Sequence, residues 1–256
     1  MATVQNILQF IESVAPPALT LEGDNVGLLC GRADKEVKTV LVALDPFPSV
    51  CREAVAEGAD LLVTHHPIIH GSIFSVTEQS ASGEAILELA AHNIAAINAH
   101  TNLDCADGGV KDTLAAKLGL ADIQKIDTDP YGLLRQGLVE SQSLEAFLAK
   151  VKGNLGCVGL RYADGGKAVH KVAVGGGSCG SELSAVAKAG CDTFVTADVK
   201  YNQFWDAQML GINMIDAGHF HTENPVVAVL AEKIQAAFPG VQVKISKNHA
   251  DCMKFY

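Results

Sequence analysis

Short apolar runs rich in β-branched residues alternate along the chain with segments in which apolar residues recur at helical spacing. The short runs are typical of buried parallel strands, and the helical spacing is typical of helices that cover a sheet. Strands are predicted at residues 39–45, 61–64, 94–99, 169–174, 193–196, 213–217 and 241–245. Helices are predicted at residues 4–14, 49–58, 84–92, 111–118, 143–151, 181–189, 201–210 and 225–238. This alternation predicts an α/β fold with mainly parallel central sheets.

The alternation weakens between residues 123 and 130, where Thr128-Asp129-Pro130 is typical of a loop. It then resumes, and both halves share a layout in which a strand leads into a polar, His-bearing turn. We therefore predict two similar α/β domains. The first comprises residues 1–125 with 240–256, and the second comprises residues 126–239.

Composition narrows the class of protein. The 256 residues are 48% hydrophobic but only 5% aromatic, so aliphatic side chains must fill the core. Acidic residues number 29 against 19 Lys and Arg, and no basic cluster offsets the net charge of −10, which argues against tight binding to duplex DNA. The N-terminus lacks the pattern of a secretory signal, and no apolar run is long enough to span a membrane. Seven cysteines without a CxxC pair argue against a disulfide framework. Together these features predict a cytoplasmic protein.

Two predicted strands lead into possible metal ligands. His65 and His66 follow the strand at 61–64, and His100 and Asp104 follow the strand at 94–99, with Asp104 expected on a loop. Ligands gather at the carboxyl ends of strands in parallel α/β sheets. Other interpretations stay open. His65 and His66 can be a chance pair on the surface. His100 can be a ligand, a residue that orients a ligand through a hydrogen bond, or only a capping residue.

A third strand end, after residues 213–217, carries His219 and Glu223. Four residues apart, they share one face of a helical turn, although Thr222-Glu223 is also compatible with a helix cap. Three imidazoles and two carboxylates without a thiolate suit two adjacent divalent cations of the first transition row that share a carboxylate: Zn, Mn, Fe, Co or Ni. The predicted ligands are His65, His66, Asp104, His219 and Glu223.

A glycine-rich stretch, Gly175–Gly180, joins the strand at 169–174 to the next helix. Such a turn can present backbone N–H groups to an anion, but it lacks both the Walker A and the GxGxxG patterns. It is equally compatible with a tight strand-to-helix turn that binds nothing.

Four motifs together resemble the NIF-three-like proteins, often labelled GTP cyclohydrolase I type 2 homologues. The motifs are Asp24-Asn25-Val26-Gly27-Leu28, Thr64-His65-His66-Pro67, His100-Thr101-Asn102-Leu103-Asp104 and Gly218-His219-Phe220-His221-Thr222-Glu223. The resemblance covers nearly the whole chain. It implies a dinuclear metal site in a cleft between two similar α/β domains, with the same five ligands, and a ring-shaped homohexamer.

The resemblance also suggests a reaction, the metal-dependent hydrolysis of a nucleotide-like or other heterocyclic substrate. Two cations activate a water and hold an electrophile, and His100 and His221 are the candidates for moving protons. Two other functions stay open. One is two-metal phosphoester hydrolysis, and the other is a non-catalytic role as a metal-binding regulator, chaperone or store. The motif Asp24–Leu28 suggests no ligand and is interpreted as structural or cavity-lining.

Overall fold

The computed structural model describes residues 1–256 as two compact units. Unit 1 comprises residues 1–107 and 227–250, and unit 2 comprises residues 108–226 and 251–256. Each unit is an α/β layer structure around one sheet, which confirms the predicted fold class. The domain limits expected from the sequence, at residues 125 and 239, stay a prediction. No helix is long and apolar enough to cross a membrane.

Unit 1 is built on a five-stranded sheet in the order β1-β4-β3-β2-β11. The strands are β1 (Gly27–Cys30), β2 (Thr39–Ala43), β3 (Leu61–Thr64), β4 (Ala95–Asn98) and β11 (Gln242–Ile245). The four strands from β4 to β11 run parallel, and β1 joins the edge antiparallel to β4. The carboxyl ends of β2, β3 and β4 therefore lie side by side.

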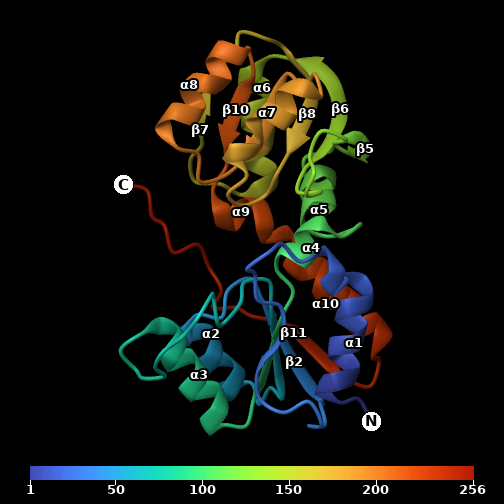
Figure 1. The fold of residues 1–256 in the computed structure, drawn as a ribbon, viewed down its shortest axis with the longest axis vertical. Helices are drawn as coiled ribbons and strands as arrows, with labels where there is room; N and C mark the ends of the chain where they lie inside the picture. Colours follow the sequence, from blue (N-terminus) through green and yellow to red (C-terminus); the bar gives the residue numbers. More distant parts are fainter. The chain divides into compact units, whose positions relative to one another are not determined.

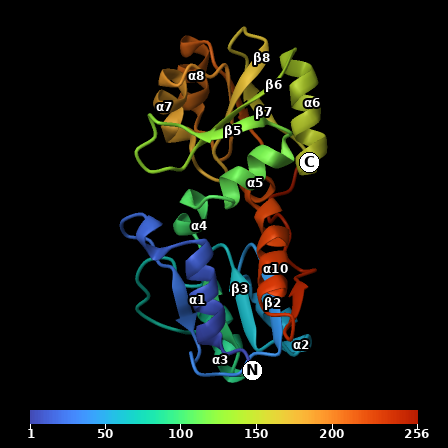
Figure 2. The same cartoon turned by 90° about the vertical axis from the view of Figure 1, so that its right-hand side faces the viewer.

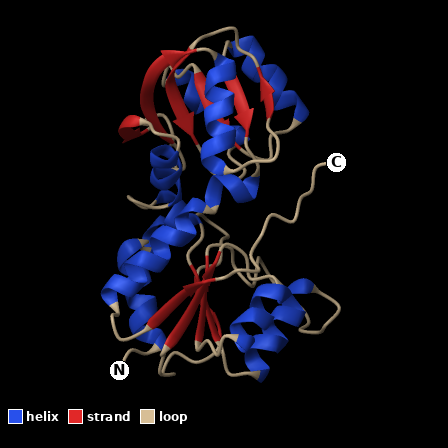
Figure 3. Cartoon of the chain, turned by 180° about the vertical axis from the view of Figure 1, so that it is seen from behind, coloured by secondary structure: helices blue, strands red, loops and turns tan.

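Helices cover both faces of this sheet (Figures 1 and 3). The helices are α1 (Val4–Val14), α2 (Pro48–Ala56), α3 (Ala81–Ala91) and α10 (Pro225–Ala237), with the short η1 (Pro17–Leu19) and α4 (Thr101–Cys105) at its rim. Successive side chains of a strand point to opposite faces of the sheet. On one face, Leu41 and Leu62 pack with Val50 of α2 and Leu89 of α3. Their neighbours along the strands point to the opposite face, which α1 and α10 cover.

Unit 2 is built on a six-stranded sheet in the order β5-β6-β8-β9-β10-β7. Strands β5, β6 and β8 of this sheet are labelled in Figure 2. The strands are β5 (Ala121–Lys125), β6 (Arg135–Gln142), β7 (Arg161–Ala163), β8 (Val169–Val174), β9 (Thr193–Thr196) and β10 (Asn213–Asp216). Strands β8, β9 and β10 form a parallel centre, and β5, β6 and β7 extend it antiparallel.

Two buried clusters sandwich this second sheet. The helices are α5 (Val110–Lys117), α6 (Leu144–Leu155), α7 (Leu183–Lys188), α8 (Tyr201–Leu210) and α9 (His219–Glu223), with the short η2 (Gly180–Glu182). Val172 and Val195 pack with Phe147 and the other apolar residues of α5 and α6, whereas Ala173 and Phe194 pack with α7 and α8. Alternate residues of each central strand thus serve opposite faces.

The predicted helices and parallel strands are present, with ends displaced by up to a few residues. Four strands were not predicted, namely β1, β5, β6 and β7, and each pairs antiparallel with its neighbours. Their residues are mostly half-buried or exposed, so they lack the continuous apolar run that marks a buried parallel strand.

Phe147 is fully buried in the α6 layer, whereas Phe74 lies 99% exposed in the loop before α3. The change Phe147→Ala should lower the free energy of unfolding by about 3–5 kcal/mol, because it leaves a cavity in a closely packed layer. The same change at Phe74 should alter it by less than about 0.5 kcal/mol. Urea denaturation followed by circular dichroism measures both, and equal effects would contradict the packing described above.

Candidate metal centre

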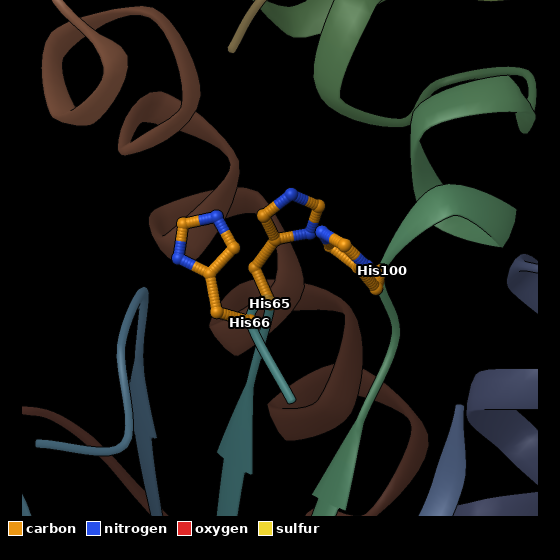
Figure 4. A group of neighbouring side chains, drawn as sticks. All are labelled: His65, His66 and His100. Carbon is orange, nitrogen blue, oxygen red and sulfur yellow. The ribbon is translucent and has the colours of Figure 1, made fainter. Parts of the chain in front are cut away.

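Three imidazoles meet at the carboxyl ends of β3 and β4 in unit 1 (Figure 4). His65 and His66 directly follow β3, and His100 follows β4 and precedes α4. The ring centroid of His65 lies 4.9 Å from that of His66 and 5.2 Å from that of His100. One nitrogen from each ring lies within 4.8 Å of the others. The parallel register of two neighbouring strands thus brings together residues 34 positions apart.

Asp104 lies beside this group, with Oδ1 3.8 Å from Nε2 of His65. The expectation of a loop for Asp104 was wrong, because residues 101–105 form α4. A helical turn projects the carboxylate from a buried position, where only 6% of the residue is exposed.

The second ring nitrogen of each imidazole is held by an oxygen atom. Nδ1 of His65 bonds to the carbonyl oxygen of Ala99 at 2.8 Å, and Nδ1 of His66 bonds to Oδ1 of Asp45 at 2.7 Å. A carbonyl oxygen only accepts, so Nδ1 of His65 carries the proton and the lone pair lies on Nε2. This is the arrangement by which proteins orient an imidazole toward a metal ion.

His100 is oriented in the same way by Asp24, whose Oδ1 lies 2.8 Å from its Nδ1. Asp24 also accepts hydrogen bonds from the backbone N–H and the hydroxyl of Thr101. Burial alone would raise the pKa of Asp24, but the bonds from Thr101 and His100 outweigh it and lower that pKa to about 2. Burial and the neighbouring His65 lower the pKa of His100. Asp24 thus contacts a candidate site residue, whereas the sequence pattern indicated only a structural or cavity-lining role.

Unit 2 carries a smaller group of donors on α9. Nε2 of His219 lies 2.9 Å from Oε2 of Glu223, and its Nδ1 lies 2.6 Å from Oδ2 of Asp198. Burial alone would lower the pKa of His219, but the bonds and charges of Glu223 and Asp198 outweigh it and raise that pKa to about 9. The predicted sharing of one face by His219 and Glu223 is correct, since α9 is helical.

Asp216 fixes the two loops that bring this group together. Its carboxylate accepts hydrogen bonds from the backbone N–H groups of Val199 and Gly218, each at 3.0 Å. One bond secures the loop that carries Asp198, and the other secures the start of α9. Asp198 and Asp45 both went unrecognised in the sequence, although each lies just beyond the end of a buried strand.

The glycine-rich turn between β8 and η2 packs directly against Glu223. A Cβ atom on Gly177, whose φ is +66°, would lie 2.1 Å from Oε1 of Glu223. The backbone N–H of Gly177 donates to the hydroxyl of Thr222 at 3.0 Å, and the buried ammonium of Lys111 donates to the carbonyl oxygen of Gly176 at 2.6 Å. Because Gly177 has no side chain, the turn leaves space for the carboxylate of Glu223, a predicted metal ligand. Whether it also binds an anion stays a prediction.

His221 points away from the α9 donors to other partners within unit 2. Its Nδ1 lies 3.2 Å from the carbonyl oxygen of Leu155, and its Nε2 lies 3.3 Å from Oδ2 of Asp251. It lines a cavity of about 300 Å³ together with Asn154 and Asn224. A role in proton transfer stays a prediction for His221, as it does for His100.

The residues present suit a transition metal. Within unit 1, three imidazoles and a carboxylate converge, and within unit 2, an imidazole and a carboxylate do so. Imidazole with carboxylate is the donor chemistry that Zn, Mn, Fe, Co and Ni accept, and each imidazole is held in the manner of a metal ligand. The histidine and acidic clusters are thus compatible with metal binding.

The fold and this donor set define the class to which the chain belongs. The family model of Duf34/NIF3 (NGG1p interacting factor 3) matches residues 2–251 of the chain. The chain therefore belongs to the Duf34/NIF3 family, which confirms the resemblance seen in its motifs.

Individual relatives agree with this assignment. The "GTP cyclohydrolase 1 type 2 homolog" of Clostridium perfringens is 32% identical, over 98% of this chain and 99% of that protein. The protein of that name from Nostoc is 36% identical, over 91% of each chain. Among solved structures, a Bacillus cereus protein related to NIF3 is similar with a TM-score of 0.93, at 25% identity over 100% of this chain and 99% of that one. The structure of reduced HcgD from Methanocaldococcus jannaschii is similar with a TM-score of 0.82, at 30% identity over 96% of this chain and 98% of that one.

The change Gly177→Ala should displace the Glu223 carboxylate, because the new methyl group would overlap Oε1. We expect metal affinity to fall about 10–100-fold, as when a supporting contact of a ligand is lost. The positive φ should add a loss of about 1–2 kcal/mol of stability. Gly153→Ala is the matched control, since its Cβ meets nothing within 4 Å and it lies inside α6. Calorimetric metal titration that finds equal affinities for both variants would contradict this contact.

In metal-free protein, His219 should titrate near pH 9 rather than near 6.5. Because the folded pKa exceeds the unfolded one, His219 stabilises the fold fully below about pH 6.5, and this contribution disappears as the pH rises through 9. NMR titration of the imidazole resonances measures the pKa directly. Asp198→Asn should move that pKa back toward 6.5, and an unchanged pKa would contradict the ion pair.

Proposed function

We propose that this chain is a metal-dependent hydrolase that acts on a nucleotide-like or other heterocyclic substrate. One observation carries the proposal, namely that the imidazoles of His65, His66 and His100 meet at two strand ends with every Nδ1 held by an oxygen acceptor. Aligning three imidazoles in this way restricts side-chain freedom, and metal binding by His65 and His66 beside a proton-transferring His100 would offset that loss.

The proposed cofactor is a pair of divalent cations of the Zn, Mn, Fe, Co or Ni class. We propose that unit 1 contributes His65, His66 and Asp104 as ligands, and that unit 2 contributes His219 and Glu223. The donor groups within each unit support this set, because neither unit alone offers enough ligands for two ions. When bound, a pair of cations lowers the pKa of a water and polarises the bond to be broken.

The chain's own residues would then handle protons and orientation. His100 would exchange a proton at Nε2, since Asp24 holds Nδ1 at 2.8 Å and fixes the ring. His221 is proposed as a second proton carrier, through the Nε2 atom that faces Asp251. Asp45 and Asp198 would orient His66 and His219, respectively, through the bonds already described.

The substrate class comes from the relatives. Curated relatives in Clostridium perfringens and Nostoc carry the name "GTP cyclohydrolase 1 type 2 homolog". Opening of a guanine ring is a hydrolysis that a metal-activated water can perform, so GTP is the first substrate to test. We also propose a ring-shaped homohexamer in the cytoplasm. None of the seven cysteines forms a disulfide bond, as is expected in a reducing compartment.

Metal content and GTP turnover test this proposal together. Wild-type protein purified without an affinity tag and reconstituted should bind two metal ions per chain by elemental analysis, and should convert GTP into a ring-opened product. His65→Ala should lose at least one ion and all turnover, because His65 is a central donor in unit 1. His92→Ala is the control, since His92 lies exposed at the end of α3.

Each outcome has a definite meaning. Metal binding without ring opening would eliminate the cyclohydrolase, and a screen of phosphoesters and other metabolites would then separate a different hydrolase from a non-catalytic metal-binding protein. A metal content near zero that reconstitution does not restore would eliminate the site itself.

A further inference from the structure

Arg161 presents an exposed guanidinium at the edge of unit 2 where the parallel strands end. It is the first residue of β7, and the antiparallel register pairs it with Asp216, the last residue of β10. Its side chain is 60% exposed. Nη2 donates to Oδ2 of Asp216 and, at 3.2 Å, to the carbonyl oxygen of Val199, and Cζ lies 5.6 Å from the centre of the Phe204 ring. Contacts with three residues thus hold a long side chain that otherwise keeps much rotamer freedom at a surface.

Most of the hydrogen-bonding capacity of this guanidinium is not used within the chain. An arginine has five N–H donors, and the two on Nη2 bond to Asp216 and Val199. The N–H of Nε and the two of Nη1 bond to no other residue of the chain. Neutralising the buried Asp216 requires only one of the five donors, so that contact does not account for the others. Donors that are exposed and already held in place are suited to bind an anion, because little freedom remains to be lost on binding.

The Asp216 carboxylate links Arg161 to the donor group of α9. Its Oδ2 accepts from Arg161 and from the backbone N–H of Val199, and its Oδ1 accepts from the backbone N–H of Gly218, the residue before His219. One carboxylate and one peptide therefore separate the guanidinium from the predicted ligand His219. An anionic group bound by Arg161 would lie beside the α9 donors, within the same unit.

Local charge at this edge favours an anion despite the net charge of −10. The carbonyl group that Arg161 holds belongs to the peptide bond before Lys200, so the exposed Lys200 brings a second cation to the same loop. Asp216 and Asp198 lie at this edge too, but Asp216 binds Arg161 and Asp198 binds an imidazole of α9. Two exposed cations on neighbouring backbone segments attract anions locally in an otherwise acidic chain.

We propose that Arg161, assisted by Lys200, binds a phosphate group of the substrate. The substrate is then a nucleotide that carries phosphate, and not a free base or nucleoside. A guanidinium is the side chain best matched to phosphate, since its planar N–H donors reach several phosphate oxygens and its charge persists at every physiological pH. The inference rests on the proposed function for the identity of the substrate, and it adds the residue that recognises the phosphate.

Calorimetric titration of the whole chain with pyrophosphate and with GTP tests this assignment, first on metal-free and then on metal-reconstituted protein. Both should bind the wild type. Arg161→Gln should weaken both by about 10–100-fold, because it removes charge-assisted hydrogen bonds. Lys200→Gln leaves the bond between Arg161 and Asp216 intact, and should weaken both by about two- to fivefold, as for an exposed ion pair. Arg52→Gln is the matched control, since Arg52 is also an exposed arginine paired with a carboxylate, but on α2 of unit 1. This variant should bind both ligands like the wild type.

The proposal is overturned if neither pyrophosphate nor GTP binds the wild type, or if Arg161→Gln binds both as tightly as the wild type. It is also overturned if Arg161→Gln loses affinity for Zn²⁺ together with phosphate while Lys200→Gln binds phosphate unchanged, because that pattern indicates that Arg161 only supports Asp216. The titration of metal-free protein requires neither metal nor turnover. Phosphate binding that depends on Arg161, without ring opening of GTP, would therefore support the phosphate site and eliminate only the cyclohydrolase.

Discussion

An imidazole binds a metal ion well when the ring is held with one nitrogen toward the ion. In this chain an oxygen atom bonded to the other nitrogen, Nδ1, holds each ring in place. Nδ1 of His65, His66, His100 and His219 is held by Ala99, Asp45, Asp24 and Asp198, respectively. Every one of these acceptors lies at or near the end of a strand or in a loop beside one. The sheets thus determine the orientation of the rings as well as their positions, and the chemistry proposed for the site depends on both.

The carboxyl ends of parallel strands explain why this much of the site was predictable. The runs at 61–64, 169–174 and 193–196 coincide with β3, β8 and β9, because continuous apolar segments mark strands buried on both faces. Since such strands end at a common edge, the polar residues that follow them become neighbours. The amino-acid pattern therefore places His65, His66 and His100 at the ends of two strands, and the distances between their rings show that these ends are neighbours.

What escaped prediction depends on contacts that no local pattern encodes. Asp24 reaches His100 across 76 residues, and the motif around it carries no periodicity that points to that histidine. Strands β5, β6 and β7 have exposed positions and pair antiparallel, so they lack the apolar runs by which buried strands are recognised. Asp45 and Asp198 differ from Asp24 in this respect. Each follows a buried strand, and the strand-end rule that groups the histidines applies equally to both.

Glu223 illustrates how a local constraint in the sequence serves a distant group. Its carboxylate is almost fully buried, and the space it occupies exists because Gly177 has no side chain. Lys111, also buried, lies 4.0 Å from Oε1 of Glu223 and holds the carbonyl oxygen of Gly176. Burying an ionised carboxylate is costly unless charges and hydrogen bonds compensate. The glycine-rich turn, α5 and α9 therefore act as one support for a single carboxylate. Glu223 therefore explains why residue 177 has no side chain, and anion binding by the turn stays a separate prediction.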